Sequence, residues 1–350
     1  MLDSSNNAPA VIGASDACIT TYVTTTILLG GAAKLSLQDQ AISSWKCALG
    51  ITSLRDPRHD ANHFVSPDPN AGNPSDKDLQ RAEGSCRIVL CNSERGTRVM
   101  DVFQQSPIRV LFPGTRGAAV EEAVFVNTAG GIAGGDRLEY SVTVLANASI
   151  ALTSQAAEKV YRALNEPAHI ATKLKASEGA KLAWLPQETI VFNRARISRE
   201  TEVELASGAE ILALEWLLLG RAAHGEEMGG GQIADSWRVK KDGRLIWGDT
   251  FRATNEIFPH LGRKALLSGC KAIATLLYFG PNLHITLEIL RDLAPSLGCS
   301  CAATLVGELM VVRFAARASS DLRLALTTVL QLFSRELGPG PFRVPKMWSC

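Results

Sequence analysis

Two glycine pairs, set close together in an apolar stretch, constrain the fold of this chain more than any other feature. They are Gly130-Gly131 and Gly134-Gly135, in the segment AVFVNTAGGIAGGDRLEY, and Asp136 follows the second pair directly. Glycine permits positive φ angles and lets other groups approach the backbone, at an entropic cost that a plain strand avoids. The segment is therefore expected to turn where another part of the molecule comes close to its main chain.

The residues on both sides of the glycines alternate between apolar and polar. Val124 and Val126 precede the turn, and Leu138, Tyr140 and Val142 follow it with the same period of two. This period is typical of half-buried strands, so the glycines are predicted to join two strands. A phosphate-binding loop would instead require Gly-Lys-Ser/Thr at the start of a helix, which this segment lacks.

Composition limits the classes of partner. The 350 residues include 36 Lys and Arg against 35 Asp and Glu, so no net charge draws the chain to nucleic acid or to an anionic membrane. Polar residues interrupt every apolar run before it reaches the roughly 18 residues of a membrane-spanning helix. The first residues do not resemble a secretory signal, and a cytoplasmic location is expected.

The eight cysteines form no CxxC pair and no compact framework, so they are interpreted as reduced thiols. Cys299 and Cys301 flank Ser300 and could offer two soft ligands to a metal. No histidine lies nearer in sequence than His284, however, and buried or incidental thiols are the favoured interpretation.

The first part of the chain differs in character from the rest. Asn, Ser, Asp and Pro cluster at residues 56–77, which contain too little periodic apolar sequence to fold alone. Residues 1–96 are therefore expected to form an N-terminal extension, largely linker or disordered. It is interpreted either as an appendage or as an upstream reading of the gene. Residues 97–350 are expected to form one β-rich domain.

Short apolar or alternating runs, separated by turn residues, predict strands over most of residues 97–253. The predicted strands are 98–103, 109–112, 123–127, 138–145, 149–153, 171–176, 181–185, 190–192, 199–205, 210–218, 233–240 and 244–251. Three small turns near residues 147, 178 and 208 recur about every thirty residues, which hints at a stacked β unit. The sequence thus predicts a mainly β fold, either a sandwich or a β-solenoid-like stack of short strands.

The last third of the chain changes period. Apolar residues three and four apart predict two C-terminal helices, over 285–293 and 322–333. Between them, residues 304–314 are typical of a hairpin that turns at Gly307. These elements are expected to pack on the same sheet system.

Few residues suggest chemistry. His224 lies in a Gly-rich segment with Glu226 and Glu227, where it could bind a divalent ion or belong to a solvated loop. Three further carboxylates lie in or beside strongly apolar runs, and each must be paired, hydrated or bound to a cation if it is buried. They are Glu158, for which Lys159 and Arg162 are possible partners, Glu188 and Glu215.

Six motifs, in order along residues 97–348, resemble the urease accessory protein family UreD, also called UreH. They are NTAGGIAGGD (127–136), TSQAAEKVYRA (153–163), WLPQETIVF (184–192), LEWLLLGR followed by GE (214–221 and 225–226), VVRF (311–314) and VPKMW (344–348). The chain departs from the family pattern at Asn193, where an aspartate is common, and at Lys346, where arginine is frequent.

The resemblance implies a mainly β fold and a non-catalytic role. Members of this family bind the urease apoprotein and, with UreF and the GTPase UreG, deliver nickel to the urease active site. No tightly bound cofactor is implied, only transient Ni²⁺. Candidate residues for its route are Asp136, Glu158, Glu188, Glu215 and His224. Motif residues expected to serve the fold or partner binding are Asn127, Gly130, Gly131, Gly134, Gly135, Lys159, Tyr161, Gln187 and Arg221.

One alternative from a different class remains. A metal-dependent hydrolase could use His224 with Glu226 and Asp136. The sequence contains neither GxSxG nor HExxH, which counts against this hypothesis.

Overall fold

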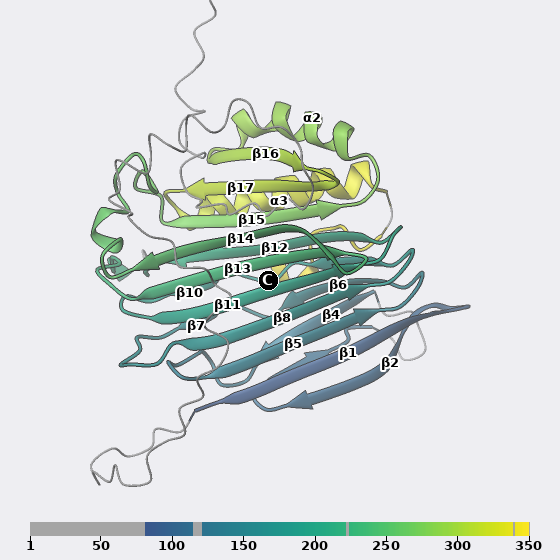
Figure 1. Cartoon of the computed structure of the whole chain (residues 1–350), viewed down its shortest axis with the longest axis horizontal. Helices are drawn as coiled ribbons and strands as arrows, with labels where there is room; N and C mark the ends of the chain where they lie inside the picture. The colour runs from purple at the N-terminus through teal and green to yellow at the C-terminus, as the bar shows by residue number, and fades with distance from the viewer. Residues whose placement is uncertain (1–80, 115–120, 222–223, 339, 350) are drawn as a thin grey trace, which may run out of the picture. The chain divides into compact units, whose positions relative to one another are not determined.

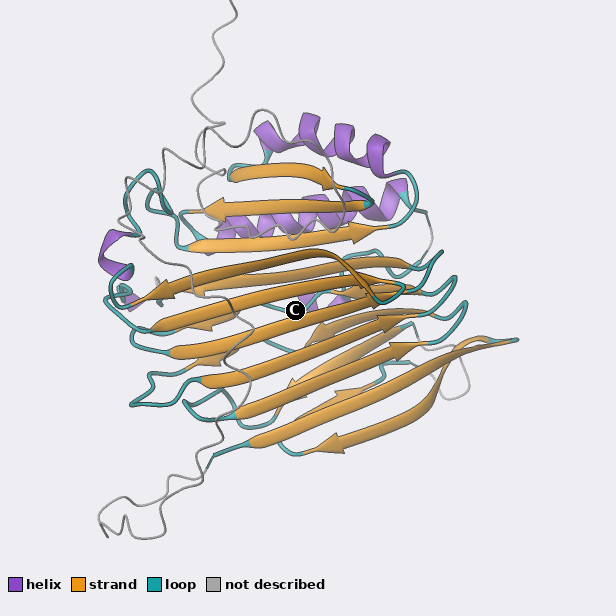
Figure 2. Ribbon diagram, viewed as in Figure 1, coloured by secondary structure: helices purple, strands orange, loops and turns teal. Residues whose placement is uncertain are grey.

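The computed structural model describes residues 81–114, 121–221, 224–338 and 340–349. This part of the chain is built mainly from strands arranged in two sheets (Figure 1). The predicted fold class is confirmed: the strands form a β-solenoid-like stack, and two helices follow near the C-terminus (Figure 2). No helix within the described ranges is long and apolar enough to cross a membrane.

The first sheet has seven strands, in the spatial order β14-β13-β11-β8-β5-β1-β2. The five central strands pair in parallel, and β2 and β14 close the two ends through antiparallel pairing. The strands are β1 (Glu83–Ser93), β2 (Gly96–Gln105), β5 (Arg137–Val144), β8 (Ala168–Ala176), β11 (Arg196–Leu205), β13 (Gln232–Lys241) and β14 (Arg244–Thr254).

The second sheet has ten strands, and eight of them run in the order β16-β17-β15-β12-β9-β6-β4-β3. The eight are β3 (Ile108–Leu111), β4 (Glu122–Asn127), β6 (Ser149–Ser154), β9 (Lys181–Trp184), β12 (Glu210–Leu219), β15 (Ala272–Phe279), β16 (Ser300–Val306) and β17 (Leu309–Ala316). Two short strands, β7 (Glu158–Val160) and β10 (Thr189–Val191), join this sheet beside β12 through parallel pairing.

The chain passes repeatedly from the first sheet to the second, from β5 to β6, from β8 to β9 and from β11 to β12. The three recurring turns of the sequence make these passages. They stack on one another: Lys181 N donates to Ala148 O at 2.9 Å, and Glu210 N donates to Ala180 O at 2.8 Å. The stacked β unit hinted at by the thirty-residue spacing is therefore confirmed.

The main apolar core lies between the two sheets, because alternate residues of each strand point inward. In β11, Ile197, Val203 and Leu205 are buried among the core residues. A second apolar cluster lies between β12, β15 and β17 on one side and the helices α2 (Leu283–Leu293) and α3 (Ser319–Glu336) on the other. Both helices occupy the predicted positions, and β16 and β17 form the predicted hairpin around Gly307.

The boundary expected between residues 96 and 97 lies too late in the sequence. Strand β1 falls within the expected extension and pairs with both β2 and β5. Its residues Cys86, Ile88 and Leu90 are buried in the core between the sheets, with the period of two of a half-buried strand. The rest of the expected extension, residues 1–80, lies outside the described residues.

Candidate functional site

The glycine-rich segment carries the chain from β4 in the ten-stranded sheet to β5 in the seven-stranded sheet. It joins two strands as predicted, although the strands belong to different sheets. Gly131 faces the Tyr161 ring, and a Cβ atom at residue 131 would lie only 2.4 Å from that ring. The Tyr161 hydroxyl donates to Gly130 O at 3.1 Å. The close approach inferred from the glycines is thus made by a side chain of the same chain.

The Asp136 carboxylate fastens this loop to the start of β1. Its Oδ1 accepts a hydrogen bond from Ala82 N at 2.8 Å, and its Oδ2 accepts one from Ala133 N at 2.8 Å. The residue is only 5% exposed. Because both oxygens bind backbone amides, the carboxylate has a structural explanation that requires no metal ion.

Glu158 lies half-buried on β7. Its carboxylate accepts a hydrogen bond from Asn127 Nδ2 at 3.0 Å, and burial raises its pKa. The suggested partners Lys159 and Arg162 are not the residues that bond to it. Successive strand residues point to opposite faces, and Lys159 accordingly points to solvent. Among the residues that the structure describes, the carboxylate is therefore hydrogen-bonded to a neutral amide and no cation forms an ion pair with it.

Glu215 belongs to a buried ion-pair network between the two sheets. Arg199 Nη1 on β11 lies 2.6 Å from Glu215 Oε2 on β12. The same guanidinium donates to both oxygens of Asp235 on the neighbouring strand β13, each at 2.8 Å. Trp184 Nε1 donates to the other Glu215 oxygen at 2.8 Å. Burial raises the pKa of Glu215, and the adjacent guanidinium opposes that rise.

A second arginine link crosses between the sheets nearby. Arg313 on β17 pairs with Asp249 on β14, and its Nη1 donates to Thr275 Oγ1 at 2.7 Å. A cavity of about 50 Å³ lies beside both links and is lined by Glu215, Asp235, Thr275 and Arg313 among others. Polar groups are thus concentrated in one part of an otherwise apolar interior.

Glu188 and Gln187 serve a different purpose, because both bind Arg323 of α3. Arg323 Nη2 lies 2.6 Å from Glu188 Oε2 and 2.9 Å from Gln187 Oε1. Its guanidinium also lies over the rings of Trp216 and Trp348, 5.2 Å and 5.6 Å from their centroids. This motif therefore holds α3 and the C-terminal segment against the ten-stranded sheet.

An open pocket of about 450 Å³ lies where β7, β10 and β12 end and β15 and α3 begin. We call it the His224 pocket. It brings together five of the residues singled out in the sequence: Lys159, Tyr161, Glu188, Arg221 and His224. The other candidates lie elsewhere, in or beside the glycine loop, in the interior between the sheets or, for Gln187, against Arg323 of α3.

The two glutamates that follow His224 are paired with cations. Glu226 Oε2 lies 3.0 Å from Arg221 Nε, and Glu227 Oε1 lies 3.1 Å from Lys271 Nζ. Within the described ranges, no three His, Cys, Asp or Glu side chains are grouped so that they could hold a metal ion. The hydrolase hypothesis also lacks its geometry, because Glu226 pairs with Arg221 and Asp136 binds backbone amides.

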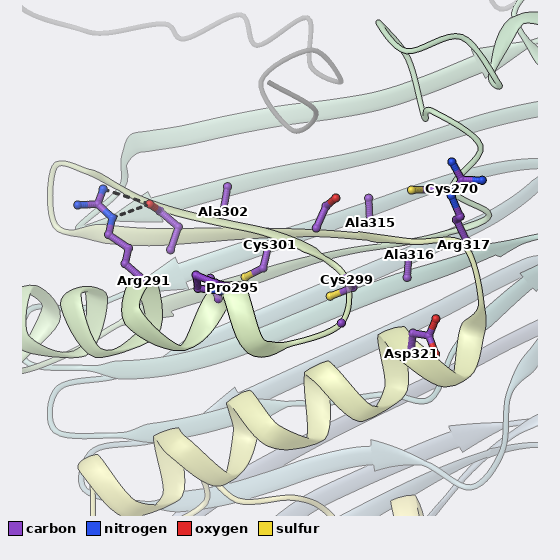
Figure 3. Close-up of a pocket in the computed structure, with 14 residues that line it drawn as sticks. Cys270, Arg291, Pro295, Cys299, Cys301, Ala302, Ala315, Ala316, Arg317 and Asp321 are labelled. Atoms are coloured by element: carbon purple, nitrogen blue, oxygen red, sulfur yellow. Dashed lines mark hydrogen bonds between the residues drawn. The ribbon is translucent and has the colours of Figure 1, made fainter. Parts of the chain in front are cut away.

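Three cysteines line a larger pocket of about 730 Å³ beside β16 and the start of α3 (Figure 3). They are Cys270, Cys299 and Cys301. Burial raises the pKa of the Cys299 thiol to about 11 and that of the Cys301 thiol to about 12. Raised pKa values of this size favour the protonated thiols at neutral pH, which disfavours a role as nucleophiles. All three cysteine side chains are partly buried.

The sequence analysis did not identify three residues of these networks: Arg199, its partner Asp235, and Arg323. Arg199 and Asp235 fall at inward positions of strands that alternate with a period of two, so their burial follows from that pattern. No sequence pattern around Arg323 indicates its partners, because its contacts depend on how α3 packs on the sheet.

Comparisons with known proteins agree with the motifs. The model of the family described as UreD urease accessory protein matches residues 82–349. A urease accessory protein UreD from Rhizobium etli is 39% identical over 270 residues, which are 77% of this chain and 96% of the relative. One from Xanthobacter autotrophicus is 38% identical over 81% of this chain and 95% of its own length. One from Methylobacterium sp. (strain 4-46) is 38% identical over 79% of this chain and 98% of its own length.

Proposed function

We propose, from the premise that this chain belongs to the UreD urease accessory protein family, that it is a non-catalytic scaffold for urease maturation. It binds the urease apoprotein and acts with UreF and UreG in the GTP-dependent insertion of nickel, in the cytoplasm. The observation that carries this proposal is the extent of the match, residues 82–349, which spans nearly all of the described chain.

Nickel is the cargo of this assembly and is bound only in passing. Ni²⁺ accepts oxygen and imidazole ligands, and a carrier that must release its metal is better served by scattered groups than by a thiolate cage. Among the five candidates, Asp136, Glu188 and Glu215 already have strong partners. Glu158 and His224 fit transient binding best, because the partner of Glu158 within the described ranges is a neutral amide and His224 is exposed in a pocket.

Exposed apolar residues support a role that requires partners. Strand β2 forms one end of the seven-stranded sheet, and its residues Met100, Val102 and Phe103 are 66%, 42% and 48% exposed. Leu111, on the end strand of the other sheet, is 57% exposed. Exposed apolar surface of this kind is a common mark of protein interaction sites. We expect the isolated chain to be poorly soluble and to gain solubility when co-expressed with UreF.

Co-purification tests the scaffold role. A tagged form of the full chain is expressed with the urease subunits, with and without UreF and UreG, and the bound proteins are identified by mass spectrometry. The proposal predicts that urease apoprotein and UreF are retained in near-stoichiometric amounts. A chain that is soluble alone and retains neither protein would contradict it.

A further inference from the structure

The His224 pocket has a cationic rim that the maturation role does not explain. The lining cations come from four separate places in the fold, and Ser319, the first residue of α3, lies among them. They are Lys159 on β7, Arg221 after β12, Lys271 before β15 and Arg317 before α3. The positive end of the α3 dipole adds to the same field.

The acidic residues near the rim do not cancel this charge. Glu188 lines the pocket but pairs with Arg323, while Glu226 and Glu227 pair with Arg221 and Lys271. No ion-pair partner of Lys159 is found in the described part of the chain, and Arg317 donates to the carbonyl oxygen of Ser268. The four lining cations together with Arg323 outnumber the three carboxylates that pair with them, Glu188, Glu226 and Glu227, so an excess of positive charge remains at the opening.

The pocket also has an apolar floor. It is lined by Ile190, Phe192, Leu218 and Leu219. Phe192 is held between two side chains of the rim: the Tyr161 ring meets it edge-on with centroids 5.2 Å apart, and the Arg221 guanidinium lies 4.4 Å from its centroid. These contacts give the pocket a fixed wall on that side.

We propose that the His224 pocket is a docking site for an acidic segment of a partner protein. The docked segment places one of its apolar side chains on the pocket floor and one of its carboxylates at the cationic rim. The pocket volume of about 450 Å³ exceeds what a single small anion fills. A purely apolar ligand would leave the rim cations unused, whereas an acidic segment with apolar side chains matches both parts of the pocket. Such docking is independent of the role in urease maturation, so either can fail without the other.

Selection from a phage-displayed library of randomised short peptides on the purified full chain tests this site. The selected peptides are expected to combine acidic with apolar residues. Their dissociation constants are then measured by fluorescence anisotropy at about 0.05 M and about 0.5 M salt, and binding is expected to weaken at the higher concentration because salt screens exposed charges.

Charge-reversal variants locate the binding. Lys159→Glu and Lys271→Glu are each expected to weaken the selected peptides about tenfold, or about 1.4 kcal/mol. Lys173→Glu, on the exposed face of β8, is the matched control and is expected to leave the affinity unchanged. Thermal unfolding of each variant checks that it remains folded. Selected peptides without acidic residues, or equal losses in Lys159→Glu and Lys173→Glu, would overturn the proposal.

Discussion

Arg199 Nη1 lies 2.6 Å from Glu215 Oε2, so a buried guanidinium joins the two sheets of the β-solenoid. The side chains of Arg199 and Glu215 are 3% and 5% exposed, and the same arginine holds both oxygens of Asp235. Removing one member of a buried pair costs more than the pair contributes, because an uncompensated charge remains in the interior.

Arg199→Met is therefore expected to lower the free energy of unfolding by about 3–5 kcal/mol at neutral pH, measured by urea denaturation. The control is Arg87→Met, which breaks an exposed pair with Asp101 at 3.4 Å. That change is expected to cost less than about 1 kcal/mol. Equal effects of the two substitutions would show that the buried network contributes no special stability.

Glu158 gives a prediction for pH dependence. Burial raises the pKa of the Glu158 carboxyl in the folded state above the ordinary value of 4.5. At a pH between 4.5 and this raised pKa, the folded chain therefore binds more protons at Glu158 than the unfolded chain does. The free energy of unfolding attributable to this residue thus falls as pH rises through that interval. Glu158→Gln should be more stable than the parent at pH 7, with a difference that closes below about pH 4.5.

The measurement is a series of urea denaturation curves across that pH range, with Glu139→Gln on the exposed face of β5 as the control. A stability difference between Glu158→Gln and the parent that does not change with pH would contradict a raised pKa of Glu158 in the folded chain.

The same substitution separates stability from cargo handling. Because Glu158→Gln removes a carboxylate from the proposed nickel route, urease activation at limiting nickel should fall although the protein is more stable. Glu139→Gln should leave activation unchanged. Full activation by Glu158→Gln would remove this residue from the route.

The contact between Gly131 and Tyr161 is testable by a double-mutant cycle. Gly131→Ala places a methyl group against the ring, where a Cβ atom would lie 2.4 Å away, and should cost about 1–3 kcal/mol of stability. Tyr161→Leu provides room, so the double variant should lose less than the sum of the two single losses. Thermal unfolding of the three variants checks this, and strict additivity would show that the strain lies elsewhere.

Arg323→Met should loosen α3. The substitution removes hydrogen bonds to Glu188 and Gln187 and the stacking on Trp216 and Trp348. We expect a loss of about 1–3 kcal/mol and faster amide hydrogen exchange in α3 and the C-terminal segment. Arg335→Met, at the exposed end of the same helix, is the control and should change neither quantity. Unchanged exchange in the Arg323 variant would contradict the anchoring role.

The local structure is predictable from the sequence, because the alternation of apolar residues in strands and the residue types at turns depend on neighbouring positions. The predicted strands from residue 98 onward, the hairpin at Gly307 and both helices are present. The missed strand β1 has a clear alternation at Cys86, Ile88 and Leu90, but the polar composition of the preceding residues outweighed it. The missed strand β15 is apolar except for Thr275 and shows no alternation, so periodicity alone does not distinguish it from a buried helix.

The site was less predictable because it depends on contacts between distant elements. Glu215 and Glu188 were correctly identified as carboxylates that need partners, yet Arg199 and Arg323 come from strand and helix positions that only the fold brings near. Asp136 is a candidate for the nickel route from its motif alone, and only the fold shows that its two oxygens accept hydrogen bonds from the backbone amides of Ala82 and Ala133. A pattern of residue types does not reveal which carboxylates are already bonded within the fold.

The central claim is the role in urease maturation, and urease activity tests it most directly. Cells that carry the urease genes and all other accessory genes are grown at limiting nickel, with and without this chain, and urease activity is measured per amount of urease protein. The account predicts activity that depends on the chain and that additional nickel restores only in part. Equal activity with and without the chain would contradict it.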